Sequence, residues 1–196
     1  MTADGRSFSL EWRSTDPDRA ARRVMRRLVG ADVSALRLRF ATASAAGATL
    51  SFVAGPPPDD RIVIGDGLAA EPATDVPFRL LALAIATLEL GSLGGDEPVD
   101  ERALGARGLA TDVDGRAVVL LEPTTEGRLA GSLARFGPGP CGLYLAAEHR
   151  PPLVTAPERP GILGPTRLIL GGPAWGPHLL VVAAHRQPAG SSTIAP

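Results

Sequence analysis

The chain has 196 residues, 44% of them apolar, and a formal net charge of −1, a composition typical of a soluble globular protein. Its basic residues are all arginine and are scattered among a similar number of acids, so no basic stripe indicates a nucleic-acid partner. No apolar run reaches the roughly 18 residues that a membrane-spanning helix needs, so no membrane partner is expected.

The single cysteine, Cys141, excludes an internal disulfide and suits a reducing compartment. Residues 1–16 lack the basic and then apolar regions of a secretory signal. We therefore expect a cytoplasmic protein. Arginine without lysine, together with many Ala, Gly and Pro residues, is typical of a GC-rich bacterial genome.

The first third of the chain predicts a strand, a helix and three more strands. Residues 8–15 alternate apolar and polar side chains, as a half-buried strand does. Asp16 is placed to cap the helix that follows, Pro17 suits its first turn, and Gly30 ends it. Strands are then expected at 36–41, 49–54 and 61–64, so residues 7–66 read as one βαβββ unit.

The middle of the chain begins after a Pro- and Ala-rich connector, residues 67–77. The apolar run at 78–90 fits either a buried strand or a buried helix. One or two helical turns are expected over 100–106. A hairpin of strands 109–112 and 116–121 is expected across Asp114-Gly115, the strongest turn signal in the sequence.

The stretch 118–145 is the centre of the prediction. An apolar strand ends at Glu122-Pro123, and a short helix follows, with Thr125 as its cap and Leu129, Leu133 and Phe136 on one face. The GPGP sequence at 137–140 breaks the helix, and a strand starts at Cys141.

The last part of the chain predicts two closing strands. The proline-rich segment 149–165 disfavours a regular helix. Strands are expected at 167–170 and 178–184, joined by a Gly- and Pro-rich turn, and 187–196 form a flexible tail. The order of elements indicates a unit repeated about three times, roughly every 60 residues, with residues 78–186 holding two paired units.

These features resemble the vicinal-oxygen-chelate superfamily of glyoxalases, bleomycin-resistance proteins and dioxygenases. Leu121-Glu122-Pro123, then the LARFGPGP segment at 133–140 and the strand at Cys141, are similar to the junction of its epimerase branch, where an LEP strand end leads through a short helix to a GxGxHH strand start. The resemblance implies an α+β fold in which repeated βαβββ units form curved mixed sheets around a cleft. It also implies a homodimer.

The resemblance implies metal ligands on the first and last strands of each paired unit, and this chain lacks most of them. Glu122 keeps one carboxylate position, whereas one histidine position falls at about Ala82 and the other at Cys141 or Gly142. The last carboxylate position falls near Leu180 or Val181. A lone carboxylate does not hold a divalent ion, so no metal is expected, although Cys141, His178 and Glu122 remain an alternative, rearranged site.

Two residues are candidates for chemistry. Glu122 can act as a general base in the cleft, or it is a solvated residue at a strand end. Cys141 can bind a ligand or act as a nucleophile, but free cysteines are more often small buried apolar groups, and that interpretation is favoured.

Four more residues are candidates for ligand binding: Tyr144, Arg167, Trp175 and His178. Tyr144 alternates with leucines and so points to the other face of its strand, towards a pocket or into the core. Trp175 lies in a Gly/Pro loop, where it can cover a cleft or the end of the sheet. Arg167 and His178 start the closing strands, where they offer charge and hydrogen bonds or are simply exposed.

We therefore expect a small-molecule binding protein of the bleomycin-resistance type, with a natural product as one class of ligand and no cofactor. Two alternatives stay open. The first is a glyoxalase-like isomerase or lyase, either metal-independent with Glu122 as base or using the rearranged metal site. The second is a degenerate module that serves only as a partner surface.

Overall fold

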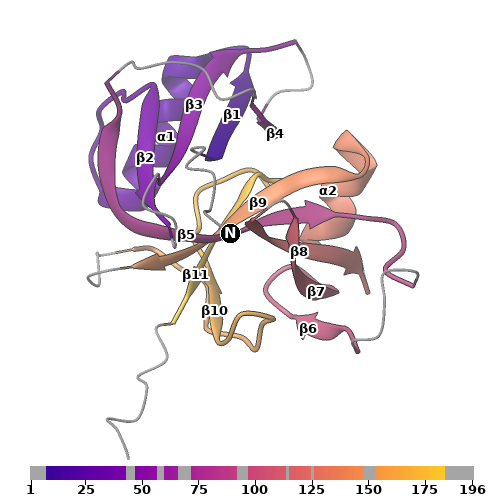
Figure 1. The fold of residues 1–196 in the computed structure, drawn as a ribbon. Coiled ribbons are helices and arrows are strands. Elements are labelled where there is room, and N and C mark those ends of the chain that lie inside the picture. Colours follow the sequence, from indigo (N-terminus) through magenta and orange to yellow (C-terminus); the bar gives the residue numbers. More distant parts are fainter. Residues whose placement is uncertain are drawn as a thin grey trace, which may run out of the picture.

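The computed structural model describes residues 8–42, 47–56, 60–65, 72–91, 97–113, 115–124, 126–147 and 153–183. Within them the chain forms one mixed sheet of 11 strands and two helices, an α+β fold (Figure 1). No helix in these ranges is long and apolar enough to span a membrane.

The elements follow one another in three groups along the chain. The first group is β1 (Phe8–Ser14), α1 (Pro17–Val29), β2 (Arg37–Ala41), β3 (Ala48–Ala54) and β4 (Arg61–Ile64). The second is β5 (Thr74–Ala86), β6 (Val99–Glu101), β7 (Ala106–Val113) and β8 (Arg116–Pro123). α2 (Arg128–Phe136) leads to the third, which is β9 (Gly139–Ala147), β10 (Thr166–Leu168) and β11 (His178–Val182).

One pairing rule recurs in the three groups. In each group the first strand pairs in parallel with a later strand: β1 with β3, β5 with β8, and β9 with β11. That later strand also pairs antiparallel with the strand before it in the chain: β3 with β2, β8 with β7, and β11 with β10. This recurrence is the repeated unit expected from the sequence. One detail differs, because β4 pairs with the outer edge of β1 instead of completing the first repeat.

β5 joins the groups because its two halves have different neighbours. Its N-terminal half pairs with β2, its C-terminal half pairs with β8, and β9 runs antiparallel along its other edge. Figure 1 shows β5 curving from the β1–β4 group into the remaining strands. The apolar run at 78–90, ambiguous in the sequence, is therefore a strand as far as Ala86, and the strand begins at Thr74, within the predicted connector.

The helix predicted after Asp16 is confirmed. The Asp16 side chain accepts a hydrogen bond from the Arg19 backbone N–H at 2.9 Å, and Gly30 ends α1 in the left-handed conformation at φ +72°. Ala20, Val24 and Leu28 are buried on one side of α1, against β1 and β3. Burial of that apolar stripe stabilises the helix in place.

Two local predictions are wrong. Residues 99–101 form strand β6 instead of the first helical turn, because the Glu101 side chain is buried in the core and its strand pairs with β7. The N-cap residue of α2 is Gly127, which has no side chain to cap with. Thr125 and Asp114 lie outside the described residues. The predicted hairpin is confirmed as β7 and β8, with Gly115 at φ +75° in its turn.

Alternate residues of β5, β9 and β11 supply two separate hydrophobic cores. Leu83, Leu143 and Leu179 pack with α1 and the first group. The neighbouring residues on these strands face the opposite side, which we call the inner face. Its buried residues include Ala82, Ala84, Leu104, Val119, Leu121, Leu129, Tyr144, Leu168, Leu180 and Val182. The inner face is filled by its own side chains, so the cleft expected between the curved strands is occupied by core.

Candidate functional site

Most of the metal-ligand positions predicted from the resemblance are occupied by apolar residues on the inner face. Ala82 and Leu180, which stand at predicted ligand positions, are both buried among apolar side chains. No group of three or more His, Cys, Asp or Glu residues that could hold a metal ion occurs in the described ranges. The rearranged site of Cys141, His178 and Glu122 is therefore not formed.

Glu122 points away from the inner face and forms an ion pair on the β7–β8 hairpin. Its Oε2 accepts hydrogen bonds from Arg107 Nε at 3.3 Å and Arg107 Nη2 at 3.2 Å. The carboxylate is thus engaged by Arg107 on the hairpin instead of facing a cavity. This position does not support the general-base role considered from the sequence.

Tyr144 lies on the opposite face from Leu143 and Leu145, as expected, but it points into the inner-face core. It is fully buried, and its hydroxyl donates to Glu101 Oε2 at 2.9 Å. The backbone N–H of Ile162 donates to the same oxygen at 3.4 Å, while Glu101 Oε1 has no partner among the described residues. Burial raises the pKa of the Glu101 carboxyl, although both hydrogen bonds oppose that shift.

His178 is buried, with 2% of its surface exposed, instead of standing free at a strand start. Its Nε2 lies 3.4 Å from the Ser132 hydroxyl. Burial, followed by the positive charge of Arg128, lowers the pKa of His178 to about 4, so the ring is neutral at pH 7. Burial also raises the pKa of the Cys141 thiol to about 12, which leaves no thiolate to act as a nucleophile.

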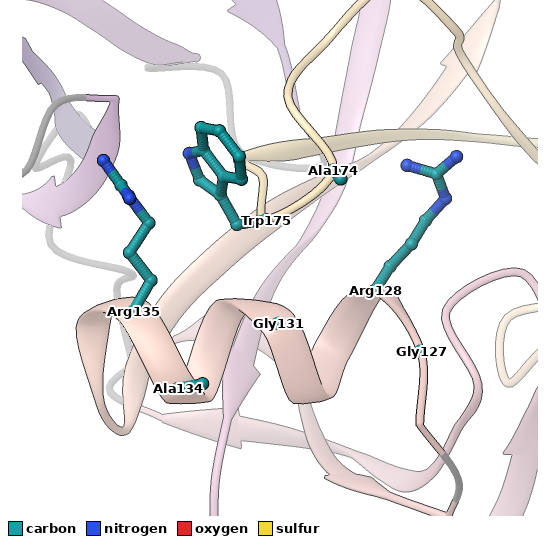
Figure 2. Close-up of a pocket in the computed structure, with 7 residues that line it drawn as sticks. All are labelled: Gly127, Arg128, Gly131, Ala134, Arg135, Ala174 and Trp175. Carbon is teal, nitrogen blue, oxygen red and sulfur yellow. The ribbon is translucent and has the colours of Figure 1, made fainter.

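An open cleft of about 640 Å³ lies between α2 and the loop 171–177 that precedes β11. It is lined by Gly127, Arg128, Gly131, Ala134 and Arg135 of the α2 segment and by Ala174 and Trp175 of the loop. Figure 2 shows Arg128 and Arg135 rising from the same side of α2, with Trp175 between them. This volume is in the range of clefts that hold small molecules.

The helical period explains which α2 residues face the cleft. Arg128, Gly131 and Arg135 are spaced by three and four residues and so form one stripe. Leu129 lies on the other side, buried in the inner-face core. The same amphipathic helix thus closes the core with one face and lines the cleft with the other.

The cleft is cationic and partly aromatic. The guanidinium carbon of Arg135 lies 4.5 Å from the Trp175 ring centroid, and 38% of the Trp175 surface is exposed. Neither Arg128 nor Arg135 forms an ion pair with any acid in the described part of the chain. Two positive charges and an indole ring therefore line the cleft, and no acid of the described residues pairs with either charge.

Two hydrogen-bonding side chains fix the loop that presents Trp175. Ser132 of α2 donates its hydroxyl to the Trp175 carbonyl oxygen. Arg27 of α1 donates to the carbonyl oxygens of Leu170 at 3.1 Å and Ile169 at 2.9 Å. The guanidinium lies so close to Gly172 that a Cβ there would meet Nη1 at 2.7 Å. The loop is thus held by both helices.

The structure brings only part of the predicted set to the cleft. Trp175 lines it. His178 does not, but it lies next to Ser132 of α2 on the buried side of the helix. Arg167 instead pairs with Glu158 at 3.0 Å on β10, and Tyr144 and Glu122 also lie elsewhere. The sequence analysis missed Arg128, Gly131 and Arg135, although their spacing on the face opposite Leu129 was a signal that could have found them.

No family model and no curated protein matches the chain. Among solved structures, a hypothetical protein from Bacillus halodurans C-125 is similar at 16% identity over 53% of this chain and 92% of its own, with a TM-score of 0.40. Methylmalonyl-CoA epimerase from Streptomyces coelicolor, in complex with 2-nitronate-propionyl-CoA, is similar at 17% identity over 54% and 98%, with a TM-score of 0.39. A variant of 4-hydroxymandelate synthase from Streptomyces coelicolor is similar at 14% identity over 88% and 68%, with a TM-score of 0.37. Similarity at this level assigns no activity to the present chain.

Proposed function

We propose that this protein binds an anionic small molecule in the cleft between α2 and the 171–177 loop. The observation that carries the proposal is that Arg128 and Arg135, neither of them ion-paired with an acid of the described residues, line the cleft beside the partly exposed Trp175. An anion there gains charge-assisted hydrogen bonds, and an apolar part of the ligand gains contact with the indole. The proposal keeps the small-molecule binding expected from the sequence, but it assigns the ligand to this cleft instead of the inner face.

Binding without turnover is favoured by the residues that line the cleft. Arginines, glycines, alanines and a tryptophan offer charge, donors and apolar surface, but no group that exchanges a proton near neutral pH. The nearest candidate, His178, is buried behind Ser132 and is neutral at pH 7. The isomerase or lyase alternative has no corresponding support.

Gly131 offers a direct test, because a Cβ built there meets no heavy atom within 4 Å. A larger side chain at this position enters the cleft without disturbing the fold, and replacing a helical glycine also favours the helix by up to about 1 kcal/mol. Gly131→Leu should therefore block the cleft, whereas the matched control Gly131→Ala stabilises the helix while adding only one methyl group.

The probe is naphthalene-2-sulfonate, a planar aromatic monoanion, titrated by isothermal calorimetry, with 2-naphthylmethylammonium as the cationic counterpart. We expect the wild type and Gly131→Ala to bind the sulfonate, Gly131→Leu to lose at least about tenfold in affinity, and the cation not to bind. Equal binding of the two probes, or no effect of Gly131→Leu, would contradict the proposal.

A further inference from the structure

We infer that the ligand is an elongated molecule with an anionic group at each end and a planar middle, an inference that rests on the binding function proposed above. The cleft has a cationic end at Arg128, a second cationic end at Arg135, and an indole between them (Figure 2). Each of these three features restricts the ligand in a different way.

The spacing of the two arginines gives the length. Arg128 and Arg135 are seven residues apart on α2, and a rise of 1.5 Å per residue separates their Cα atoms by roughly 10 Å along the helix axis. Seven residues also make nearly two full turns, so both side chains leave the helix on the same side. A compact single anion contacts one of them, whereas a longer dianion contacts both.

At the Arg135 end, the guanidinium is already oriented. Its carbon lies 4.5 Å from the centroid of the Trp175 ring and 5.7 Å from that of Phe136. A stacked guanidinium keeps the N–H groups at its edge available, and its planar donors match a carboxylate or sulfonate. Because the ring restrains the side chain before binding, an anion loses less conformational entropy there.

At the Arg128 end, the surroundings add positive field, and Arg128 forms no ion pair with an acid among the described residues. Arg128 is the first residue of α2, where the backbone N–H groups give the helix its positive end. The charges of Arg128 and Arg27 act together on the buried His178 ring behind the cleft wall. An anion bound by Arg128 therefore relieves repulsion among cations as well as forming its own hydrogen bonds.

Between the two ends, the cleft favours a flat group. Gly131 and Ala134 present little side chain from α2, and open space lies above Gly131. The Trp175 ring, held through its carbonyl by Ser132, forms the facing wall. A planar apolar spacer fits between these surfaces and can stack on the indole. The ligand class is thus an elongated aromatic dianion.

The test compares three probes by isothermal calorimetry on the 196-residue chain: biphenyl-4,4′-disulfonate, biphenyl-4-sulfonate and the shorter dianion benzene-1,3-disulfonate. The long dianion should bind at least about tenfold more tightly than either of the others, because one more charge-assisted contact is made. Arg128→Gln and Arg135→Gln should each reduce the affinity for the long dianion to about that for the monoanion.

Two control variants separate site effects from general ones. Arg22→Gln removes an exposed positive charge from α1, outside the cleft, and should leave all affinities unchanged. Arg135→Lys keeps the charge but loses the planar fork, so it should recover only part of the affinity lost in Arg135→Gln.

The outcomes distinguish this inference from the function on which it rests. If the long dianion binds no better than the monoanion, or keeps its advantage after either substitution to Gln, the two-ended ligand is wrong while anion binding in the cleft stands. If no sulfonate binds and Gly131→Leu changes nothing, both proposals are overturned.

Discussion

The inner face and the α2 cleft both place an aromatic side chain against an ionisable one. The two pairs differ in their exposure to solvent. On the inner face, Tyr144 and Glu101 are fully buried and hydrogen-bonded to each other. In the cleft, Trp175 and Arg135 stack in the presence of solvent, and the arginine has no acidic partner in the described chain. The first pair is enclosed in the core, whereas the second lines an open cleft.

The comparison shows that the pairing of strands does not determine where a site lies. The parallel pairs β5–β8 and β9–β11 create a curved surface of the kind expected to hold a ligand. The side chains on that surface close it. The helix that links the two pairs then carries the polar residues on its outer side, so the candidate cleft lies on the other side of α2.

The largest change in the free energy of unfolding should come from deleting the buried aromatic ring, and deleting the exposed one is its comparison. Tyr144→Ala removes a fully buried ring and leaves a cavity, so the free energy of unfolding should fall by about 3–5 kcal/mol in urea denaturation. Trp175→Ala, the matched deletion in the cleft, should cost about 1 kcal/mol or less, since 38% of the residue's surface is exposed. Similar losses in the two variants would remove the distinction between the regions.

The free energy of unfolding should depend on pH through His178, the buried neutral residue next to the cleft. The pKa of His178 is lowered from 6.5 to about 4, so the unfolded chain binds a proton that the folded chain does not. Its contribution is therefore fully present above pH 6.5 and is lost as the pH falls through about 4, by up to about 3 kcal/mol. Urea denaturation between pH 7.5 and 4.5 measures the slope.

His178→Asn is the control for that slope. The variant lacks the titrating ring and should show a flatter dependence over the same pH range. An unchanged slope would mean that the pKa of His178 is the same in the folded and unfolded chain, contrary to its buried position.

Arg27 tests whether the loop needs its attachment to α1. Arg27→Met keeps much of the apolar stem but removes the hydrogen bonds to the carbonyl oxygens of Ile169 and Leu170. We expect unfolding to become about 1–3 kcal/mol easier and the affinity for naphthalene-2-sulfonate to fall, although Arg27 does not line the cleft. An unaltered affinity would show that Ser132 alone positions Trp175.

The smallest effect should come from Glu101→Gln. Burial raises the pKa of Glu101, so its contribution is present below pH 4.5 and is lost as the pH rises through the folded-state value. Near pH 4.5 the substitution should cost about 1 kcal/mol or less, because the Tyr144 hydroxyl can still donate to an amide oxygen. At higher pH the variant should match or exceed the wild type in urea denaturation. A constant difference between pH 4.5 and 8 would contradict the buried, desolvated carboxyl.

Periodicity and turn residues were sufficient to predict most of the strands and both helices. The cap at Asp16, the turn at Gly115 and the break at 137–140 act locally, so the sequence displays them. Strand β6 was missed because its position depends on Glu101 meeting Tyr144, a contact between residues 43 positions apart. Local propensity contains no information on such a pair.

The site was predicted less well for a related reason. Trp175 could be singled out because an aromatic residue in a Gly/Pro loop is unusual. Arg128 and Arg135 were not singled out because exposed arginines on a helix are common. Their side of α2 lines a cleft because the loop held by Arg27 lies opposite it, which the sequence does not show. Attention to the polar face of α2 would have identified them.

The most direct test of the account is a titration of ¹⁵N-labelled protein with biphenyl-4,4′-disulfonate, followed in ¹H–¹⁵N correlation spectra. The two tryptophans provide internal reporters, because Trp12 is buried and donates its indole N–H to Asp60, whereas Trp175 lines the cleft. The account predicts shifts of the Trp175 indole and the Gly131 amide, with Trp12 and the amides of β9 around Tyr144 unchanged. Shifts concentrated in β5 and β9, with Trp175 unmoved, would place the ligand on the inner face and contradict it.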